Sequence, residues 1–348
     1  MKKVLSLCLA LILVLGLVGT FASADNGKIR VGLMPSAVGA PVQLAKEKGY
    51  FDEEGLEIEM VIFPNGAAIN EAMAAGELDL ACSGAATVFA LANGNAVLIG
   101  DVEASGGMGI WVKPESDILS VKGQIEKYPE MYGSAETIKG KSFVCSLGTA
   151  SQFNVLRYIE QYGLTDSDIE IVNMDWSPAV QAFTIDEVDC IATFSPYSFQ
   201  AMEAGGQLIC TFEDATETAL YDMLFSDRTF LEKNREDVVK FTRAFYKAVD
   251  DLANDEEMRG TWSREWFASE GRIYDEETMA QEIIDRPYCS TAVMAEDDYI
   301  LGEAMYSYAA FNVSIEKIED WQLDYMKDCY DSSILTDALG FAVKQPQF

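Results

Sequence analysis

The clearest indication of fold class is "GYFDEEGLEIEMVIFPNGAAINEAMAAGELDLACSGAATVFALANG" (residues 49–94). In this stretch, strand-like apolar runs alternate with segments whose apolar residues recur at helical spacing. The runs 56–63 and 78–84 are short and rich in apolar residues, which is typical of buried strands. Between them, 67–77 places apolar residues at helical spacing and contains a glycine near its end. Strands that alternate with helices predict an α/β unit with a parallel sheet covered on both faces.

The same alternation occurs twice along the chain. The first unit begins with the strand-like run 29–34, and the run 107–114 leads out of it. A second unit of roughly a hundred residues then begins at "SFVC" (142–145), a size within the usual range of domains. After about residue 228 the chain is mostly helical, and the segment 235–255 carries one apolar stripe. Two α/β units joined by extended crossings predict two lobes with a cleft between them.

The N-terminal residues 1–24 combine a basic start, an apolar run and a closing "ASA". This pattern predicts a cleaved secretory signal peptide, and the alternative is a membrane anchor. The run is short for a bilayer span, and small residues follow it where an anchor would carry charges. Cys8 lies inside the run and not at the cleavage point, so no lipid attachment motif is indicated. We therefore expect a periplasmic or secreted protein.

Composition excludes several classes of function. The formal net charge of −32 disfavours nucleic acid as a partner, because both surfaces would repel each other. The chain contains no histidine, which removes Ser-His-Asp and Cys-His triads and zincin motifs. We expect no metal and no cofactor.

Six cysteines follow the signal peptide, and none of them forms a CxxC pair. They are Cys82, Cys145, Cys190, Cys210, Cys289 and Cys329. An exported chain permits disulfides, and a Cys289–Cys329 bridge is one possible pairing. Buried free thiols are the alternative.

The turn "GTASQ" (148–152) separates the apolar run 142–145 from a helix. A helix start leaves N–H groups without partners and carries partial positive charge, so it can bind a carboxylate, sulfonate or phosphate. Small residues at 148 and 150 would admit a ligand, and the hydroxyls of Thr149 and Ser151 would add donors. The alternative is ordinary capping of the helix by Thr149 or Ser151.

Other small polar turns follow the predicted strands, and ligands of open parallel sheets bind beyond the carboxyl ends of the strands. An aromatic face at such a position could stack on an apolar or cationic ligand. The predicted ligand-binding residues are Ser36, Asn65, Ser83, Gly84, Ala85, Gly148, Thr149, Ala150, Ser151, Gln152, Trp176 and Tyr197. Asp175 and Asp222 are acidic candidates for an amine on the ligand, with a solvated cap or turn as the alternative for each.

Four stretches together resemble the substrate-binding proteins of ABC importers, in the branch that handles nitrate, sulfonates, taurine and thiamine-pyrimidine precursors. They are 49–94, "GTASQFNVLRYIEQYGL" (148–164), "VDCIATFSPYSFQAMEAGG" (188–206) and "FLEKNREDVVKFTRAFYKAVDDLAND" (230–255). The resemblance is carried by their order and spacing, since no single motif is decisive.

The resemblance implies the type II periplasmic-binding-protein fold, with two α/β lobes, a hinge and a cleft between them. Residues 25–112 plus 215–348 would form lobe I, and residues 113–214 would form lobe II. Crossing segments near 109–113 and 208–213 would form the hinge, about which ligand binding closes the lobes. The closed, monomeric protein would deliver its small-molecule ligand to an ABC permease in the membrane.

No arginine occurs in the strand-end turns, and bidentate arginine is the usual means of gripping a planar anion. A ligand with one acidic end and an apolar, aromatic or amine-bearing body therefore suits these turns better than nitrate. Two alternatives are a receptor that serves a signalling partner and an enzyme on the same fold. Catalysis by Cys82 or Cys145 would need a thiolate held by a nearby cation, and neither has one in its local sequence.

Overall fold

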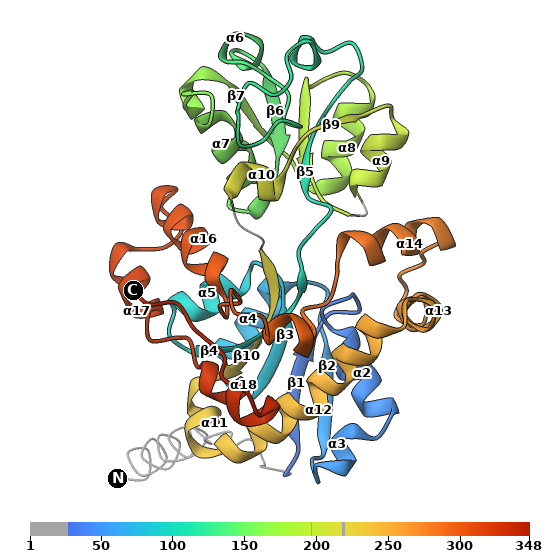
Figure 1. Ribbon diagram of the computed structural model, residues 1–348, viewed down its shortest axis with the longest axis vertical. Coiled ribbons are helices and arrows are strands. Elements are labelled where there is room, and N and C mark those ends of the chain that lie inside the picture. The colour runs from blue at the N-terminus through green and yellow to red at the C-terminus, as the bar shows by residue number, and fades with distance from the viewer. Residues whose placement is uncertain (1–26, 196, 218–219) are drawn as a thin grey trace, which may run out of the picture.

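The protein is described here from a computed structural model that covers residues 27–195, 197–217 and 220–348 (Figure 1). The chain folds around two five-stranded sheets, which we call sheet I and sheet II. Lobe I denotes sheet I with the helices packed on it, and lobe II denotes the same for sheet II. The predicted signal peptide at 1–24 lies outside the described residues. Within the described ranges, no helix is both long enough and apolar enough to cross a membrane.

Sheet I has the strand order β2-β1-β3-β10-β4 and sheet II the order β7-β6-β8-β5-β9. The strands of sheet I are β1 (Ile29–Leu33), β2 (Ile58–Ile62), β3 (Leu80–Ser83), β4 (Ala96–Ala104) and β10 (Tyr221–Asp227). Those of sheet II are β5 (Gly109–Val112), β6 (Ser142–Cys145), β7 (Glu170–Asn173), β8 (Cys190–Thr193) and β9 (Gln207–Thr211).

The expected all-parallel sheets are wrong in one respect, because each sheet contains one antiparallel strand. In sheet I, β10 runs antiparallel to β3 and β4, and in sheet II, β5 runs antiparallel to β8 and β9. Both strands enter their sheet from the other lobe, at the edge where the parallel strands end. A strand that enters at that edge must run against its neighbours.

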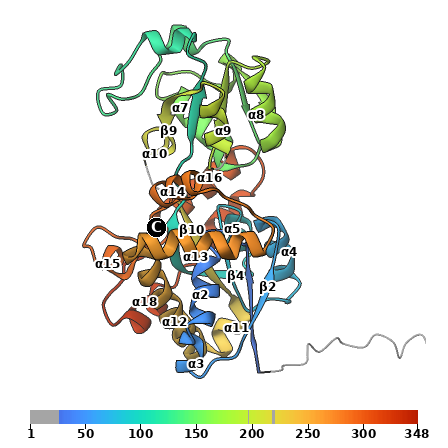
Figure 2. The same cartoon turned by 90° about the vertical axis from the view of Figure 1, so that its right-hand side faces the viewer.

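The helices of lobe I surround sheet I on two sides (Figure 2). They are α2 (Ala40–Glu47), α3 (Tyr50–Glu53), α4 (Gly66–Ala74), α5 (Thr87–Ala92), α11 (Arg228–Lys233), α12 (Arg235–Asn254), α13 (Glu256–Ser269), α14 (Glu276–Asp285), α15 (Thr291–Met294), α16 (Glu303–Ser314), α17 (Asp320–Met326) and α18 (Ser332–Leu339). Helices α2, α3, α12 and α18 pack together, whereas α4 lies across the sheet from them (Figure 2).

Lobe II places α7 on one side of sheet II and α8 with α9 on the other (Figure 1). Its helices are η1 (Asp117–Ser120), α6 (Ala135–Ile138), α7 (Ala150–Glu160), η2 (Asp166–Asp168), α8 (Trp176–Thr184), α9 (Tyr197–Glu203) and α10 (Phe212–Thr216). The two faces of sheet II are covered by separate hydrophobic clusters.

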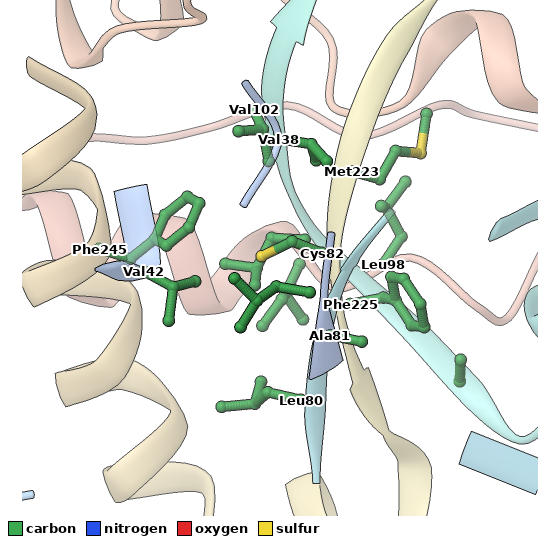
Figure 3. Close-up of a cluster of buried hydrophobic side chains, with 14 of the residues drawn as sticks. Val38, Val42, Leu80, Ala81, Cys82, Leu98, Val102, Met223, Phe225 and Phe245 are labelled. Atoms are coloured by element: carbon green, nitrogen blue, oxygen red, sulfur yellow. The ribbon is translucent and has the colours of Figure 1, made fainter. Parts of the chain in front are cut away.

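The apolar stripe predicted for 235–255 lies on α12 and faces sheet I. Its members are all buried, and they are Val238, Val239, Phe241, Phe245, Ala248, Val249 and Leu252. Figure 3 shows Phe245 of α12 and Val42 of α2 on one side of the strands that carry Cys82 and Phe225. The prediction of a helix with one buried face is therefore confirmed.

The segments expected to form the hinge lie mainly inside sheet II. Strand β5 at 109–112 pairs with both β8 and β9, and β9 itself ends at Thr211. The chain instead passes between the sheets through 105–108 and through the segment that contains α10. These two passages lie a few residues away from the positions expected from the sequence.

The suggested Cys289–Cys329 disulfide is wrong, because both cysteines are free and buried. All six described cysteines are free thiols. Cys329 lies within hydrogen-bond distance of Arg228 Nη2, which is 3.1 Å from its sulfur. These thiols serve as small buried side chains, the alternative reading of the sequence.

We expect the six thiols to be unreactive in the folded protein and reactive after unfolding. Burial raises the pKa of the Cys82 thiol well above its ordinary value and that of Cys145 to about 12, so little thiolate forms at neutral pH. Titration of the mature chain with a thiol reagent, with and without denaturant, checks this. A paired Cys289 and Cys329 would lower the denatured count by two.

Replacing Phe225 in β10 by alanine should destabilise the protein by about 3–5 kcal/mol, because the change leaves a cavity in a fully buried site. Ile273→Ala is the matched control, since that side chain is 86% exposed. Urea unfolding of both variants measures the two losses. Equal effects would contradict the central position of β10 in the core.

Candidate ligand-binding site

The two sheet edges at which the parallel strands end face each other (Figure 1). Helix α14 lies on one side of these edges and α16 on the other, both below lobe II (Figure 1). Most of the predicted ligand-binding residues lie at these two edges, since they follow β1, β2 and β3 of lobe I and β6, β7 and β8 of lobe II. We call the residues at these two facing edges the interlobe site.

The lobe I residues form one group beside Ser83. Its side chain is fully buried at the end of β3, and its Oγ has no hydrogen-bond partner among the described residues. A Cβ added at Gly66, the first residue of α4, would lie 2.5 Å from this oxygen. Asn65 caps α4 through its own side chain, which accepts from the N–H of Ala68 at 3.0 Å. The Asn65 side chain thus serves as a helix cap, and the hydroxyl of Ser83 is the donor of this group that has no described partner.

Ser36, Gly84 and Ala85 complete this edge. Ser36 is half-buried in the turn after β1, where its carbonyl accepts from the N–H of Ala40 at 3.1 Å. Gly84 lies against Asp222, whose Oδ1 would be 3.1 Å from an added Cβ. Ala85 packs at the margin of the lobe I core. These three residues shape the edge and bring Asp222 next to it.

In lobe II, the start of α7 is partly capped by its own side chains. Thr149 Oγ1 accepts from the N–H of Ser151 at 3.3 Å, and Gln152 Oε1 accepts from the N–H of Gly148 at 2.8 Å. Gln152 thus holds a position that an oxygen of a ligand could take. The Oγ of Ser151 is buried and has no partner among the described residues. The hydroxyl of Thr149 also donates to the carbonyl of Ser146 at 2.6 Å, so capping describes Thr149, and Ser151 is the residue of this turn whose hydroxyl lacks a described partner.

Trp176 and Tyr197 meet at the same edge of sheet II. Each is the first residue of its helix, α8 or α9, and their ring centroids are 6.3 Å apart. Phe194 contacts both, with centroids 4.8 Å from Trp176 and 5.8 Å from Tyr197. The three rings are partly exposed and form an aromatic wall, in which Phe194 was missed by the sequence analysis.

Two cations of lobe I near the interlobe site were also missed. The side chain of Lys317 lies over the α7 turn, with Cε 3.4 Å from the Cβ position of Gly148. Arg272 donates to the carbonyl of Pro64, beyond β2, at 3.4 Å. Neither forms an ion pair within the described part of the chain. Both residues come from the helical C-terminal third, where no sequence pattern marked them.

Asp222 is poorly placed to bind an amine on a ligand. Its Oδ2 lies 3.1 Å from Nη1 of Arg286, which also lies 3.3 Å from Oε1 of Glu103. Burial and the neighbouring Asp222 raise the pKa of the Glu103 carboxyl well above its usual range. Asp222 is therefore already paired with Arg286. The other acidic candidate, Asp175, is exposed at the start of α8.

The two lobes already touch on both sides of the interlobe site. On the α14 side, Ser195 Oγ donates to Asp285 Oδ2 at 2.6 Å. On the α16 side, the ring of Phe153 lies 4.6 Å from that of Phe311 and 5.8 Å from that of Tyr308. These contacts hold the two edges close to each other.

The described residues do not support the cysteine catalysis considered from the sequence, and they show no group arranged as a metal centre. Cys82 and Cys145 are buried, and their raised pKa values disfavour the thiolate that a nucleophile needs. No described group of three or more acidic or cysteine side chains is arranged to hold a metal ion.

This chain matches a known protein family and resembles several binding proteins. The NMT1-like family matches residues 22–263. A protein of Brachyspira hyodysenteriae that is assigned as an ABC transporter periplasmic binding protein is 31% identical over 339 residues, which cover 97% of each chain.

Solved structures of binding proteins share the fold. The aliphatic sulphonate binding protein SsuA of Escherichia coli superposes with a TM-score of 0.68 at 21% identity, covering 88% of this chain and 99% of its own. The nitrate-binding protein NrtA of Synechocystis PCC 6803 superposes with a TM-score of 0.64 at 12% identity, covering 91% and 89%. The periplasmic-binding-protein fold expected from the sequence is therefore confirmed, and the chain belongs to the NMT1-like family, as a relative of ABC transporter periplasmic binding proteins.

Proposed function

We propose that this protein is the extracytoplasmic substrate-binding protein of an ABC importer and that it captures a small organic acid in the interlobe site. The acid group, a sulfonate or a carboxylate, would bind at the start of α7, and the rest of the ligand would lie against the aromatic wall of Trp176, Phe194 and Tyr197. The loaded protein would deliver the ligand to a membrane permease. It would act as a monomer in the periplasm or outside the cell.

The observation that carries the proposal is the position of Lys317 over the Gly148 turn. A helix start carries partial positive charge, and a lysine without a described ion-pair partner lies across it from the other lobe. Both features favour an anion, and an anion held between them would contact both lobes. Arg272 adds a second cation beside β2.

The body of the ligand is inferred from the aromatic wall. Partly exposed rings at a site bury apolar area when a ligand covers them, and burial contributes roughly 25 cal/mol per Å². A bare inorganic anion would leave these rings in water. The wall therefore favours an organic acid over nitrate, in agreement with the absence of arginine from the strand-end turns.

The proposed binding residues are those predicted from the sequence, together with Phe194, Lys317 and Arg272. The proposed lobes are divided at 105–108 and in the segment that contains α10, with β5 in lobe II because it pairs with β8 and β9. Closure about these passages would bring the predicted residues of both lobes onto one ligand.

The first test is a thermal-shift screen of the mature protein with taurine, 1-butanesulfonate, benzoate and nitrate, accompanied by native mass spectrometry of the protein as purified. A ligand that binds only the folded state raises the melting temperature. We expect an organic acid to raise it and nitrate to raise it less. A larger shift with nitrate than with any of the three organic acids would contradict the proposal.

Lys317→Gln should weaken binding of the best acid by roughly 10- to 100-fold, the loss expected for a charge-assisted hydrogen bond. Lys233→Gln is the matched control, because Lys233 is an exposed lysine on α11 of the same lobe. Isothermal titration of both variants with the same acid measures the two affinities. Equal affinities would remove Lys317 from the site.

Gly148→Ala should impair both folding stability and acid binding, because φ is +74° and the new Cβ, 3.4 Å from Cε of Lys317, would lie between the turn and the lysine, where the acid is proposed to bind. Gly163→Ala, at the other end of α7, is the control, since φ is +72° there and nothing lies within 4 Å. Each change should cost about 1–2 kcal/mol of stability for the left-handed backbone. Only Gly148→Ala should also weaken binding in the titration.

A further inference from the structure

A second cavity lies beside the passage between the lobes and is separate from the interlobe site. Its volume is 540 Å³, and it is bounded by the end of α10, by β4 and β10, and by the segment from α15 to the start of α16. None of the residues predicted for the interlobe site lines it. Helices α10 and α15 lie on one side of the molecule, and α4 and α8 lie on the opposite side (Figure 2).

The charged residues that line this cavity are all acidic. They are Asp101, Glu217, Glu296, Asp298 and Glu303. Glu217 pairs with Lys127 at 3.0 Å, whereas Glu296, Asp298 and Glu303 form no ion pair with any residue that the structure describes. Such a lining attracts cations and repels the acids proposed for the interlobe site.

Asp101 is the independent sign of a ligand. Its side chain is 1% exposed, and Oδ2 accepts from the hydroxyl of Tyr299 at 2.9 Å and from the N–H of Gly302 at 3.0 Å. Its other oxygen, Oδ1, is buried and has no hydrogen-bond partner among the described residues. A buried carboxylate is normally paired, because leaving it without a partner costs free energy. Asp101 is among the residues that line the cavity, so a donor held there would supply the partner that this oxygen lacks.

The pKa of Asp101 indicates that burying its charged carboxylate costs folding free energy. Burial raises the pKa of its carboxyl to about 6, although the bonds from Gly302 and Tyr299 lower it. Above that pKa the folded protein holds the buried charge, and its stability falls as the pH rises from the ordinary value of 3.8 through about 6. A cation bound at Oδ1 would offset this loss.

The residues that line the cavity favour an organic ammonium group over a metal ion. The described residues contain no group of acidic or cysteine side chains arranged for a metal ion. Two aromatic residues, Tyr221 and Tyr299, line the cavity beside Asp101, and aromatic faces attract organic ammonium groups. The volume exceeds what a single metal ion needs, and the remaining carboxylates lie on a different segment from Asp101.

We propose that this cavity binds an aliphatic diamine or polyamine, with one ammonium group on Oδ1 of Asp101 and another among Glu296, Asp298 and Glu303. Because Thr216 and Glu217 come from lobe II and the other lining residues from lobe I, the bound amine would contact both lobes. The proposal does not depend on the ligand of the interlobe site.

The test is isothermal titration of the mature protein with 1,4-diaminobutane, with 1-butylamine, 1,4-butanediol and Mg²⁺ as comparison probes. We expect the diamine to bind, the monoamine to bind more weakly and the diol not to bind. Asp101→Asn should weaken diamine binding roughly tenfold or more, because it removes the charge from a charge-assisted bond. Glu187→Gln, an exposed carboxylate on lobe II, should leave the affinity unchanged.

Absence of diamine binding to the wild-type protein would overturn the proposal, as would equal affinity of Asp101→Asn and wild type. Binding of Mg²⁺ with the same heat and the same sensitivity to Asp101→Asn would overturn it in favour of a metal site. If Asp101→Asn does not fold, the doubly substituted Glu296→Gln/Asp298→Asn protein replaces it, since both residues are exposed. Unchanged diamine affinity in that variant would also overturn the proposal.

Discussion

The antiparallel insertion of β10 between β3 and β4 is the constraint on which the arrangement of both sites depends. Because β10 enters sheet I at the edge where β3 ends, Asp222 lies directly beside Gly84. The charge of Asp222 is then taken up by Arg286, and Glu103 of the adjacent strand shares the same guanidinium. Strand β10 thus places Asp222 at the interlobe site and also contributes Tyr221 and Met223 to the lining of the second cavity.

The protein separates charge between two neighbouring regions. At the interlobe site the available charges are Lys317, Arg272 and the start of α7, which favour an acid. In the second cavity they are Asp101 and three further carboxylates, which favour an amine. In a chain of net charge −32, Lys317 and Arg272, which form no ion pair with a described residue, are a local exception to the overall charge. The local placement of charged residues therefore differs between the two regions, although both belong to one acidic chain.

The sequence predicted what depends on local patterns. In 49–94, the alternation of strand-like and helix-like spacing of apolar residues predicted an α/β fold. The apolar stripe in 235–255 predicted the buried face of α12. Small polar turns after strands predicted which residues would share an edge, since the ends of parallel strands meet at one edge of a sheet. The direction of β10, the pairing state of Cys289 and the position of Lys317 over Gly148 depend on packing between segments far apart in the sequence. No periodicity within a single segment records such contacts.

The strand order also has a consequence for how the chain acquires its structure during synthesis. Sheet I cannot be completed by its N-terminal residues, because β4 ends at Ala104 and its neighbour β10 begins only at Tyr221. Until the ribosome has added all of lobe II, β3 presents an unpaired edge on which other chains could pair. The continuous lobe II can finish first. A molecule interrupted before Tyr221 would therefore combine one finished half with one that is prone to aggregate.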